Sequence, residues 1–131
     1  MVSVRKWMLA AGATVALVGL SQAQDSPQRK EMKRANLTGT NMEVILSTAE
    51  YQPGESIPLH IHHGEEAFYV LQGGTVELAN GKQIELKTGS GSINARDVPH
   101  AGFKVVGDKP IKFLTVHIVD KGAPLYDAPP K

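Results

Sequence analysis

Residues 54–73 read GESIPLHIHHGEEAFYVLQG, and within seven positions this stretch places His60, His62 and Glu66. Alternate side chains of a β-strand point to the same face, so a strand through the two histidines would project both imidazoles side by side. Imidazole and carboxylate ligands together suit first-row ions such as iron, manganese, nickel and zinc. The stretch therefore predicts part of a metal site, with His100 as the candidate for a further ligand from a distant segment.

Downstream of Thr40 the chain consists of short apolar runs separated by Gly, Pro and Asn residues. Asn80-Gly81 lies between two such runs and is a strong signal for a tight β-hairpin. Short strands with turn signals every 8–12 residues or so are typical of an all-β sandwich or barrel. We expect strands over residues 42–51, 57–63, 67–71, 75–79, 82–86, 92–94, 100–106 and 111–120.

The first 23 residues have the pattern of a secretory signal peptide. Arg5 and Lys6 precede an apolar run over residues 7–20, and small residues lead up to Ala23. The run has 14 residues, whereas a bilayer-spanning helix needs roughly 20. We therefore expect cleavage after Ala23 and a periplasmic or secreted protein, with a retained membrane anchor as the alternative.

Cleavage would leave 108 residues with 12 basic and 13 acidic side chains, which is one domain with one modest core. This even charge balance argues against nucleic acid or an acidic membrane surface as a partner. The chain has no cysteine, so a bound metal or a subunit interface is the expected source of additional stability. Strands 42–51 and 111–120 carry apolar residues on both faces, which predicts a homodimer.

Three segments follow the signal peptide in the predicted domain organisation. Residues 24–39 are polar and lack periodicity, so they are expected to form a linker or a loosely held arm. Residues 40–121 form the predicted β-barrel. Residues 122–131 contain three prolines and are expected to be an irregular tail.

The histidine stretch resembles the first motif of the cupin superfamily. The pattern G-x5-H-x-H-x3-E-x6-G fits without a gap at Gly54, His60, His62, Glu66 and Gly73. The second cupin motif, G-x5-P-x-G-x2-H-x3-N, fits in part. Its glycine and histidine are present, and its proline, second glycine and asparagine are replaced; the five positions in order are Gly89, Ala95, Asp97, His100 and Lys104. Asp97 tolerates a left-handed conformation better than most residues, so the turn before His100 is expected to persist.

The resemblance, which covers residues 40–120, implies a single-domain jelly-roll antiparallel β-barrel. It also implies a divalent transition metal, such as Fe, Mn, Ni, Zn or Cu. The ligands would be His60, His62, Glu66 and His100, and such a set leaves one or two coordination positions open. Cupins include dioxygenases, isomerases, decarboxylases and lyases, and also non-catalytic binding proteins. The favoured function is an exported metal-dependent enzyme acting on a small organic substrate; the alternative is a small-molecule-binding or sensing module whose metal is structural or absent.

Several neighbouring residues have alternative interpretations. Strand alternation places His63 on the surface, and the spacing along the strand favours Glu66 over Glu65 as the ligand. His117, within an apolar strand, is interpreted as a core or interface residue rather than a pocket group. Lys104 is more plausible as a solvated strand-end residue than as a substrate contact. Together with Arg96, however, it makes a carboxylate-bearing substrate the first class to consider.

Overall fold

The structure is a computed structural model that describes residues 25–131. The predicted signal peptide and its cleavage point lie outside the described residues. Within residues 25–131 every regular element is a β-strand, and no helix there is long and apolar enough to cross a membrane. The strands are β1 (Arg29–Asn36), β2 (Met42–Tyr51), β3 (Ser56–Ile57), β4 (Gly64–Gln72), β5 (Gly74–Leu78), β6 (Gln83–Leu86), β7 (Gly91–Asn94), β8 (Phe103–Val105) and β9 (Ile111–Asp120).

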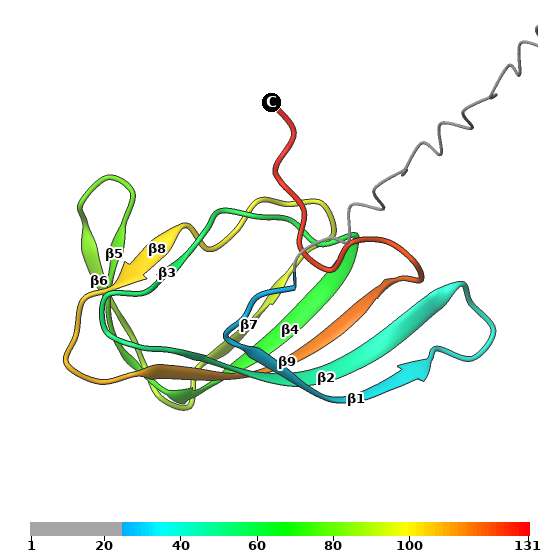
Figure 1. The fold of residues 1–131 in the computed structure, drawn as a ribbon, viewed down its shortest axis with the longest axis horizontal. Coiled ribbons are helices and arrows are strands. Elements are labelled where there is room, and N and C mark those ends of the chain that lie inside the picture. The colour runs from blue at the N-terminus through cyan, green and yellow to red at the C-terminus, as the bar shows by residue number, and fades with distance from the viewer. Residues whose placement is uncertain (1–24) are drawn as a thin grey trace, which may run out of the picture.

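The strands form two antiparallel sheets that enclose the interior between them (Figure 1). The larger sheet has the order β1-β2-β9-β4-β7, and the smaller has the order β3-β8-β5-β6. Because neighbouring strands in each sheet are often far apart in sequence, the chain crosses repeatedly between the sheets, as in a jelly roll. The predicted all-β antiparallel barrel is confirmed.

Strand β9 shows why the interior has an apolar end and a polar end. Its side chains alternate between buried and partly buried along all ten residues, as expected for a strand with one face toward the core. Ile111 and Phe113 belong to the hydrophobic core, whereas the next two inward residues are Thr115 and His117. Burying each large apolar side chain stabilises the fold by about 1.5–3 kcal/mol. Thr115 and His117 interrupt this apolar row before Val119, which is again buried, and this polar stretch of β9 is where a functional site can lie.

At two positions of the first motif the backbone accepts only glycine without strain or a clash. Gly54, in the turn between β2 and β3, has φ of 91°, a conformation that other residues adopt only with strain. Gly73 lies between β4 and β5, where an added Cβ would come within 1.9 Å of the carbonyl oxygen of Leu86. The motif therefore fixes the two ends of the segment that carries the histidines.

The predicted strand over residues 57–63 is wrong in its extent. Strand β3 ends at Ile57, and the chain continues as an extended segment held by isolated bridges. His60 and His100 exchange two backbone hydrogen bonds of 3.2 and 3.0 Å. Pro58 follows β3 directly and has no N–H to donate, which is consistent with an interrupted ladder. His60 and His62 are both buried and contribute to one cluster, whereas His63 points away from it. Ile61, between His60 and His62, is also buried and pairs with Asp127.

The segment predicted as a linker or loosely held arm contains strand β1. It pairs with β2 from Arg29 opposite Ala49 to Asn36 opposite Glu43, with one irregularity after Glu31. Seven of its eight side chains are exposed. Backbone hydrogen bonds therefore hold this edge strand, which explains why it carries no apolar alternation in the sequence.

Candidate metal centre

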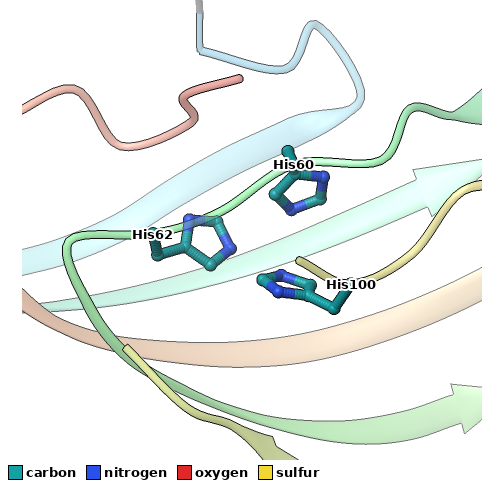
Figure 2. Close-up of side chains that lie close together, drawn as sticks. All are labelled: His60, His62 and His100. Carbon is teal, nitrogen blue, oxygen red and sulfur yellow. The ribbon is translucent and has the colours of Figure 1, made fainter. Parts of the chain in front are cut away.

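Three histidines from two segments converge at the polar end of the barrel (Figure 2). His60 and His62 come from the extended segment between β3 and β4, and His100 comes from the connection between β7 and β8. The ring centroids lie 4.8 Å apart for His60–His62, 4.4 Å for His60–His100 and 4.8 Å for His62–His100. Their ring nitrogens form a group close enough to hold one metal ion.

Backbone carbonyls fix the tautomer of all three rings. A carbonyl oxygen can only accept, so each Nδ1 must carry the proton and donate it. Each Nε2 is consequently left with its lone pair, the state that metal binding requires. The acceptors are Pro58 for His60 at 2.7 Å, Leu125 for His62 and Val98 for His100 at 2.9 Å.

The remaining nitrogens fit a metal ion. Among residues 25–131, Nε2 of His62 and Nε2 of His100 are buried without a hydrogen-bond partner. Burying a polar atom without a partner costs free energy, and a coordinated ion would remove that cost. Burial also lowers the pKa of His60 to about 4, against the opposing effect of its bond to Pro58. His60 is therefore uncharged at neutral pH and available as a ligand.

Glu66, on β4, supplies the carboxylate. Its Oε2 lies 3.4 Å from Nε2 of His62 and 3.4 Å from Nε2 of His100, and accepts a hydrogen bond from Nδ2 of Asn94 at 2.8 Å. Burial alone would raise the pKa of Glu66, but hydrogen bonding with the neighbouring imidazoles, among which His117 can present an N–H, outweighs burial and holds the pKa well below its usual range. The side chain is therefore an ionised carboxylate placed beside the histidine group.

A fourth imidazole, that of His117, also belongs to this site. His117 pairs with Glu66 across β9 and β4, is fully buried, and places its Nε2 3.3 Å from Oε1 of Glu66. Burial lowers its pKa. With Glu66 and His62 it forms a second group that could hold an ion. The sequence favoured a core or interface residue over a pocket group; His117 is fully buried, and its contact with Glu66 is what that interpretation did not include.

His117 differs from the other three histidines in one respect. Within the described part of the chain, neither of its ring nitrogens has a hydrogen-bond partner. No carbonyl fixes its tautomer, so its Nε2 is free to carry a proton toward the carboxylate of Glu66. The geometry therefore favours a role for His117 in holding Glu66 in place.

The neighbouring candidates lie outside the site. Glu65 is exposed on the outer face of β4. His63 points away from the other histidines, toward the carboxylates of Asp97 at 2.9 Å and Asp127 at 3.1 Å. These two carboxylates raise the pKa of His63. Asp97 has φ of 58°, so the left-handed turn expected before His100 is present.

Comparison with known proteins agrees with this geometry. The family pattern described as "Cupin domain" matches residues 47–117, more than half of the chain. The chain belongs to the cupin family. Cupins commonly bind a divalent metal, and the His/Glu cluster of this cupin could hold one.

Three known proteins resemble this chain in sequence or in fold. The "Oxalate-binding protein" of Thermotoga maritima is 31% identical over 80 residues, which are 60% of this chain and 65% of that protein. The polyketide cyclase RemF of Streptomyces resistomycificus is 27% identical, with a TM-score of 0.52 and coverage of 78% of this chain and 75% of that one. An uncharacterised double-stranded β-helix protein of Klebsiella pneumoniae is 21% identical, with a TM-score of 0.53 and coverage of 84% and 92%.

A cavity of about 170 Å³ adjoins the cluster of this cupin. His60, Glu66 and His100 form its polar wall, together with Asn94 and Thr115. Most of the remaining lining is apolar and comes from the inner faces of both sheets: Ala49, Ile57, Phe68, Leu86, Phe103 and Phe113. A small molecule in this cavity would lie directly against the candidate ligands.

The C-terminal segment packs against the cluster. The tail was expected to be irregular, yet Ile61 and Asp127 exchange two backbone hydrogen bonds of 3.0 and 3.1 Å. The ring of Tyr126 packs on the imidazoles, with centroids 4.8 Å from His60 and 5.0 Å from His62. Burial raises the pKa of the Tyr126 phenol, so it is protonated at neutral pH. The tail is thus part of the wall of the site.

Proposed function

We propose that this cupin is an exported, metal-dependent enzyme that acts on a small organic molecule. A divalent transition metal would be held by His60, His62, Glu66 and His100. The observation that carries the proposal is the set of three Nδ1–H bonds to backbone carbonyls. These bonds prepare three Nε2 lone pairs beside one ionised carboxylate, which is the donor set of a first-row metal site.

The chemistry of this donor set supports a catalytic rather than a closed structural centre. Four protein ligands leave one or two positions open on an ion that prefers five or six. When bound, such an ion acts as a Lewis acid that polarises a substrate oxygen. Asn94 keeps Glu66 oriented through its 2.8 Å hydrogen bond, and the wall of the adjoining cavity is largely apolar.

Location and assembly are part of the same proposal. The secretory pattern of residues 1–23 supports export to the periplasm or the medium. The apolar outer face of the larger sheet supports a homodimer, because two copies can cover this face for each other.

Metal analysis followed by probe binding tests the function. Protein purified from its native compartment should contain about one divalent ion per chain. An iron(II)- or manganese(II)-loaded sample should bind azide or nitric oxide at the metal, with a change in its absorption or electron paramagnetic resonance spectrum. Absence of this change in every metal form would refute the enzyme and favour the non-catalytic binding module. The similarity to the oxalate-binding protein of Thermotoga maritima supports that alternative.

A further inference from the structure

The charge of the cavity limits what can bind beside the metal centre. Among the described residues that line it, Glu66 is the only acid and none is Lys or Arg. The polar lining otherwise consists of imidazoles, two phenols, one amide and one hydroxyl. A ligand in this cavity therefore meets no protein cation apart from any charge on its histidines.

The basic residues that the sequence placed near the site are engaged elsewhere. Arg96 donates two hydrogen bonds, of 2.7 and 2.9 Å, to the carboxylate of Asp120. Lys104 is exposed and lies on β8 opposite Ser56. Neither residue lines the cavity, so the suggestion of a carboxylate substrate held by these two side chains is not supported.

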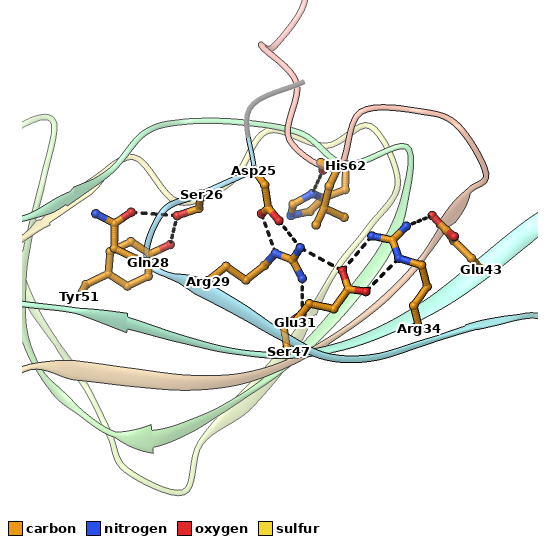
Figure 3. Close-up of polar contacts among 11 residues, drawn as sticks. Asp25, Ser26, Gln28, Arg29, Glu31, Arg34, Glu43, Ser47, Tyr51 and His62 are labelled. Carbon is orange, nitrogen blue, oxygen red and sulfur yellow. Dashed lines mark hydrogen bonds and ion pairs between the residues drawn. The ribbon is translucent and has the colours of Figure 1, made fainter. Parts of the chain in front are cut away.

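One buried cation, Arg29, lies close to the site but is already neutralised. Its side chain is only 2% exposed and pairs with the carboxylates of Asp25 and Glu31, while its Nη1 donates to Ser47 (Figure 3). Two carboxylates around one guanidinium leave no net positive charge for a ligand. A further anion here would have to break these pairs, which would leave buried charges uncompensated.

The net charge of the metal ion and its protein ligands limits the charge that a bound molecule can carry. A divalent ion and the Glu66 carboxylate together carry one positive charge, because the histidines bind as neutral ligands. A monoanion would neutralise this charge. A dianion would leave one negative charge in an apolar cavity, and burying an unpaired charge is costly.

The shape and wall of the cavity set the body of the ligand. Phe113 stands edge-on to Tyr51, with centroids 6.3 Å apart at 74°, and to Phe68, with centroids 5.8 Å apart at 89°. The cavity volume of about 170 Å³ slightly exceeds the roughly 150 Å³ of an engineered apolar cavity that binds benzene. A single aromatic ring or an aliphatic group of that size fits within it.

Thr115 adds one polar feature to this wall. Its side chain, on the inner face of β9, lines the cavity and is 5% exposed, and its Oγ1 has no hydrogen-bond partner among residues 25–131. A buried hydroxyl without a partner costs free energy, so a ligand oxygen or N–H that reaches Thr115 would be favoured.

We infer that the ligand of this cavity is a small molecule with an apolar body the size of one ring and a metal-binding oxygen group that carries at most one negative charge. A hydrogen bond to Thr115 orients it. This inference rests on the proposed metal site. It separates this cupin from a protein that binds a small dianion such as oxalate.

Two matched pairs of ligands test the inference on the zinc- or cobalt(II)-loaded protein, by calorimetry and by the cobalt absorption spectrum. Benzoate and acetate share one carboxylate and differ in the ring, so benzoate should bind about tenfold more tightly or better. Oxamate and oxalate have nearly the same shape and differ by one charge, so oxamate should bind at least as tightly. Oxalate binding as the tightest of the four would overturn the inference.

The metal content after each titration distinguishes failure of the metal site from failure of the ligand class. A protein that holds no metal refutes the proposed function, whereas a metal-loaded protein that prefers oxalate refutes the ligand class alone. Metal removed by oxalate is detected in the dialysate and is not counted as binding.

A substitution of Thr115 tests whether its hydroxyl binds the ligand. Thr115→Val keeps the volume and removes the hydrogen bond, so it should weaken benzoate binding about three- to tenfold without loss of metal. Thr75→Val, on β5 outside the cavity, is the matched control and should bind as the unaltered protein does. Equal benzoate affinity in the two variants would overturn the role of Thr115.

Discussion

The backbone carbonyl of Leu125 accepts a hydrogen bond from Nδ1 of His62, although the two residues are 63 positions apart. This contact ties the tautomer of a candidate metal ligand to the position of the C-terminal tail. The next residue, Tyr126, packs its ring against the same imidazole. The tail thus acts on the metal centre from outside the ligand set, in the way that outer hydrogen-bond partners tune a metal site.

Removal of the tail should weaken the metal centre. A chain that ends at Gly122 loses the Leu125 carbonyl and the Tyr126 ring, so His62 is free to change its tautomer. Loss of an outer partner typically lowers metal affinity about 10- to 100-fold, and we expect a loss in that range. Competition with a chelating dye measures it.

A second truncation provides the control for the tail. A chain that ends at Ala128 keeps the Leu125 carbonyl, the Tyr126 ring and the paired backbone of Asp127. It should bind metal as the full chain does. If the two truncated chains lose metal equally, the effect does not come from the contact between Leu125 and His62.

Substitution of single histidines should separate ligands from their neighbour. His60→Ala, His62→Ala and His100→Ala should each lose most of the metal, whereas His63→Ala should keep it. An ion present at 100 times its dissociation constant stabilises a fold by about 2.7 kcal/mol. For a domain of this size, that corresponds to a fall in Tm of roughly 10 °C in the three ligand variants.

The His63 variant is the test of register. His63 contacts only two partly exposed carboxylates, and exposed pairs contribute little to stability. Its Tm should change by no more than a degree or two. Metal loss in His63→Ala equal to that in His62→Ala would mean that the wrong side chains had been placed inward.

The role of His117 predicts a graded loss. If His117 holds Glu66 through Oε1, His117→Leu should lower metal affinity about tenfold, because an outer partner is lost while all four ligands remain. His117→Gln keeps a donor and should recover most of the affinity. A loss in His117→Gln as large as that in His100→Ala would instead identify His117 as a ligand.

The sequence predicted the part of the site that depends on local spacing. The alternation of side chains in an extended chain puts His60 and His62 together whether or not a ladder forms, and this held although β3 ends at Ile57. Glu66 and His100 were identified by motif spacing, and the structure brings them beside His62.

The missed features depend on distant contacts. Leu125 and Tyr126 reach the site only because the tail pairs with Ile61, and neither has a local pattern. Strand β1 was missed because backbone bonds at a sheet edge leave no apolar alternation. His117 lies on the inward face of its strand, but the sequence of an apolar strand does not show which inward residue contacts Glu66.

The outer face of the larger sheet predicts a homodimer. An apolar row crosses four strands, because Leu46, Val116, Ala67 and Ile93 are paired in succession. Ile93 is 68% exposed in the single chain. An exposed apolar row of this kind marks an interface, so light scattering at tens of micromolar should give the mass of two chains.

A charge on this row should separate the two copies. Ile93→Lys puts an ammonium group within the proposed interface and should give a monomer at the same concentration. Met32→Lys is the control, since Met32 is also exposed, at 57%, but lies on β1 outside the row. A monomeric unaltered protein, or a dimer that survives Ile93→Lys, would contradict the proposed interface.

Export predicts a simple optical property of the mature protein. Trp7 is the only tryptophan of the chain and lies within the predicted signal peptide, whereas all three tyrosines lie after it. Cleavage after Ala23 should therefore remove tryptophan emission and leave tyrosine emission alone. An intact mass that begins at Gln24 should accompany this loss, and the full chain made without export is the control, because it retains Trp7. Native protein that emits as tryptophan and carries the mass of the uncleaved chain would show that the segment is retained.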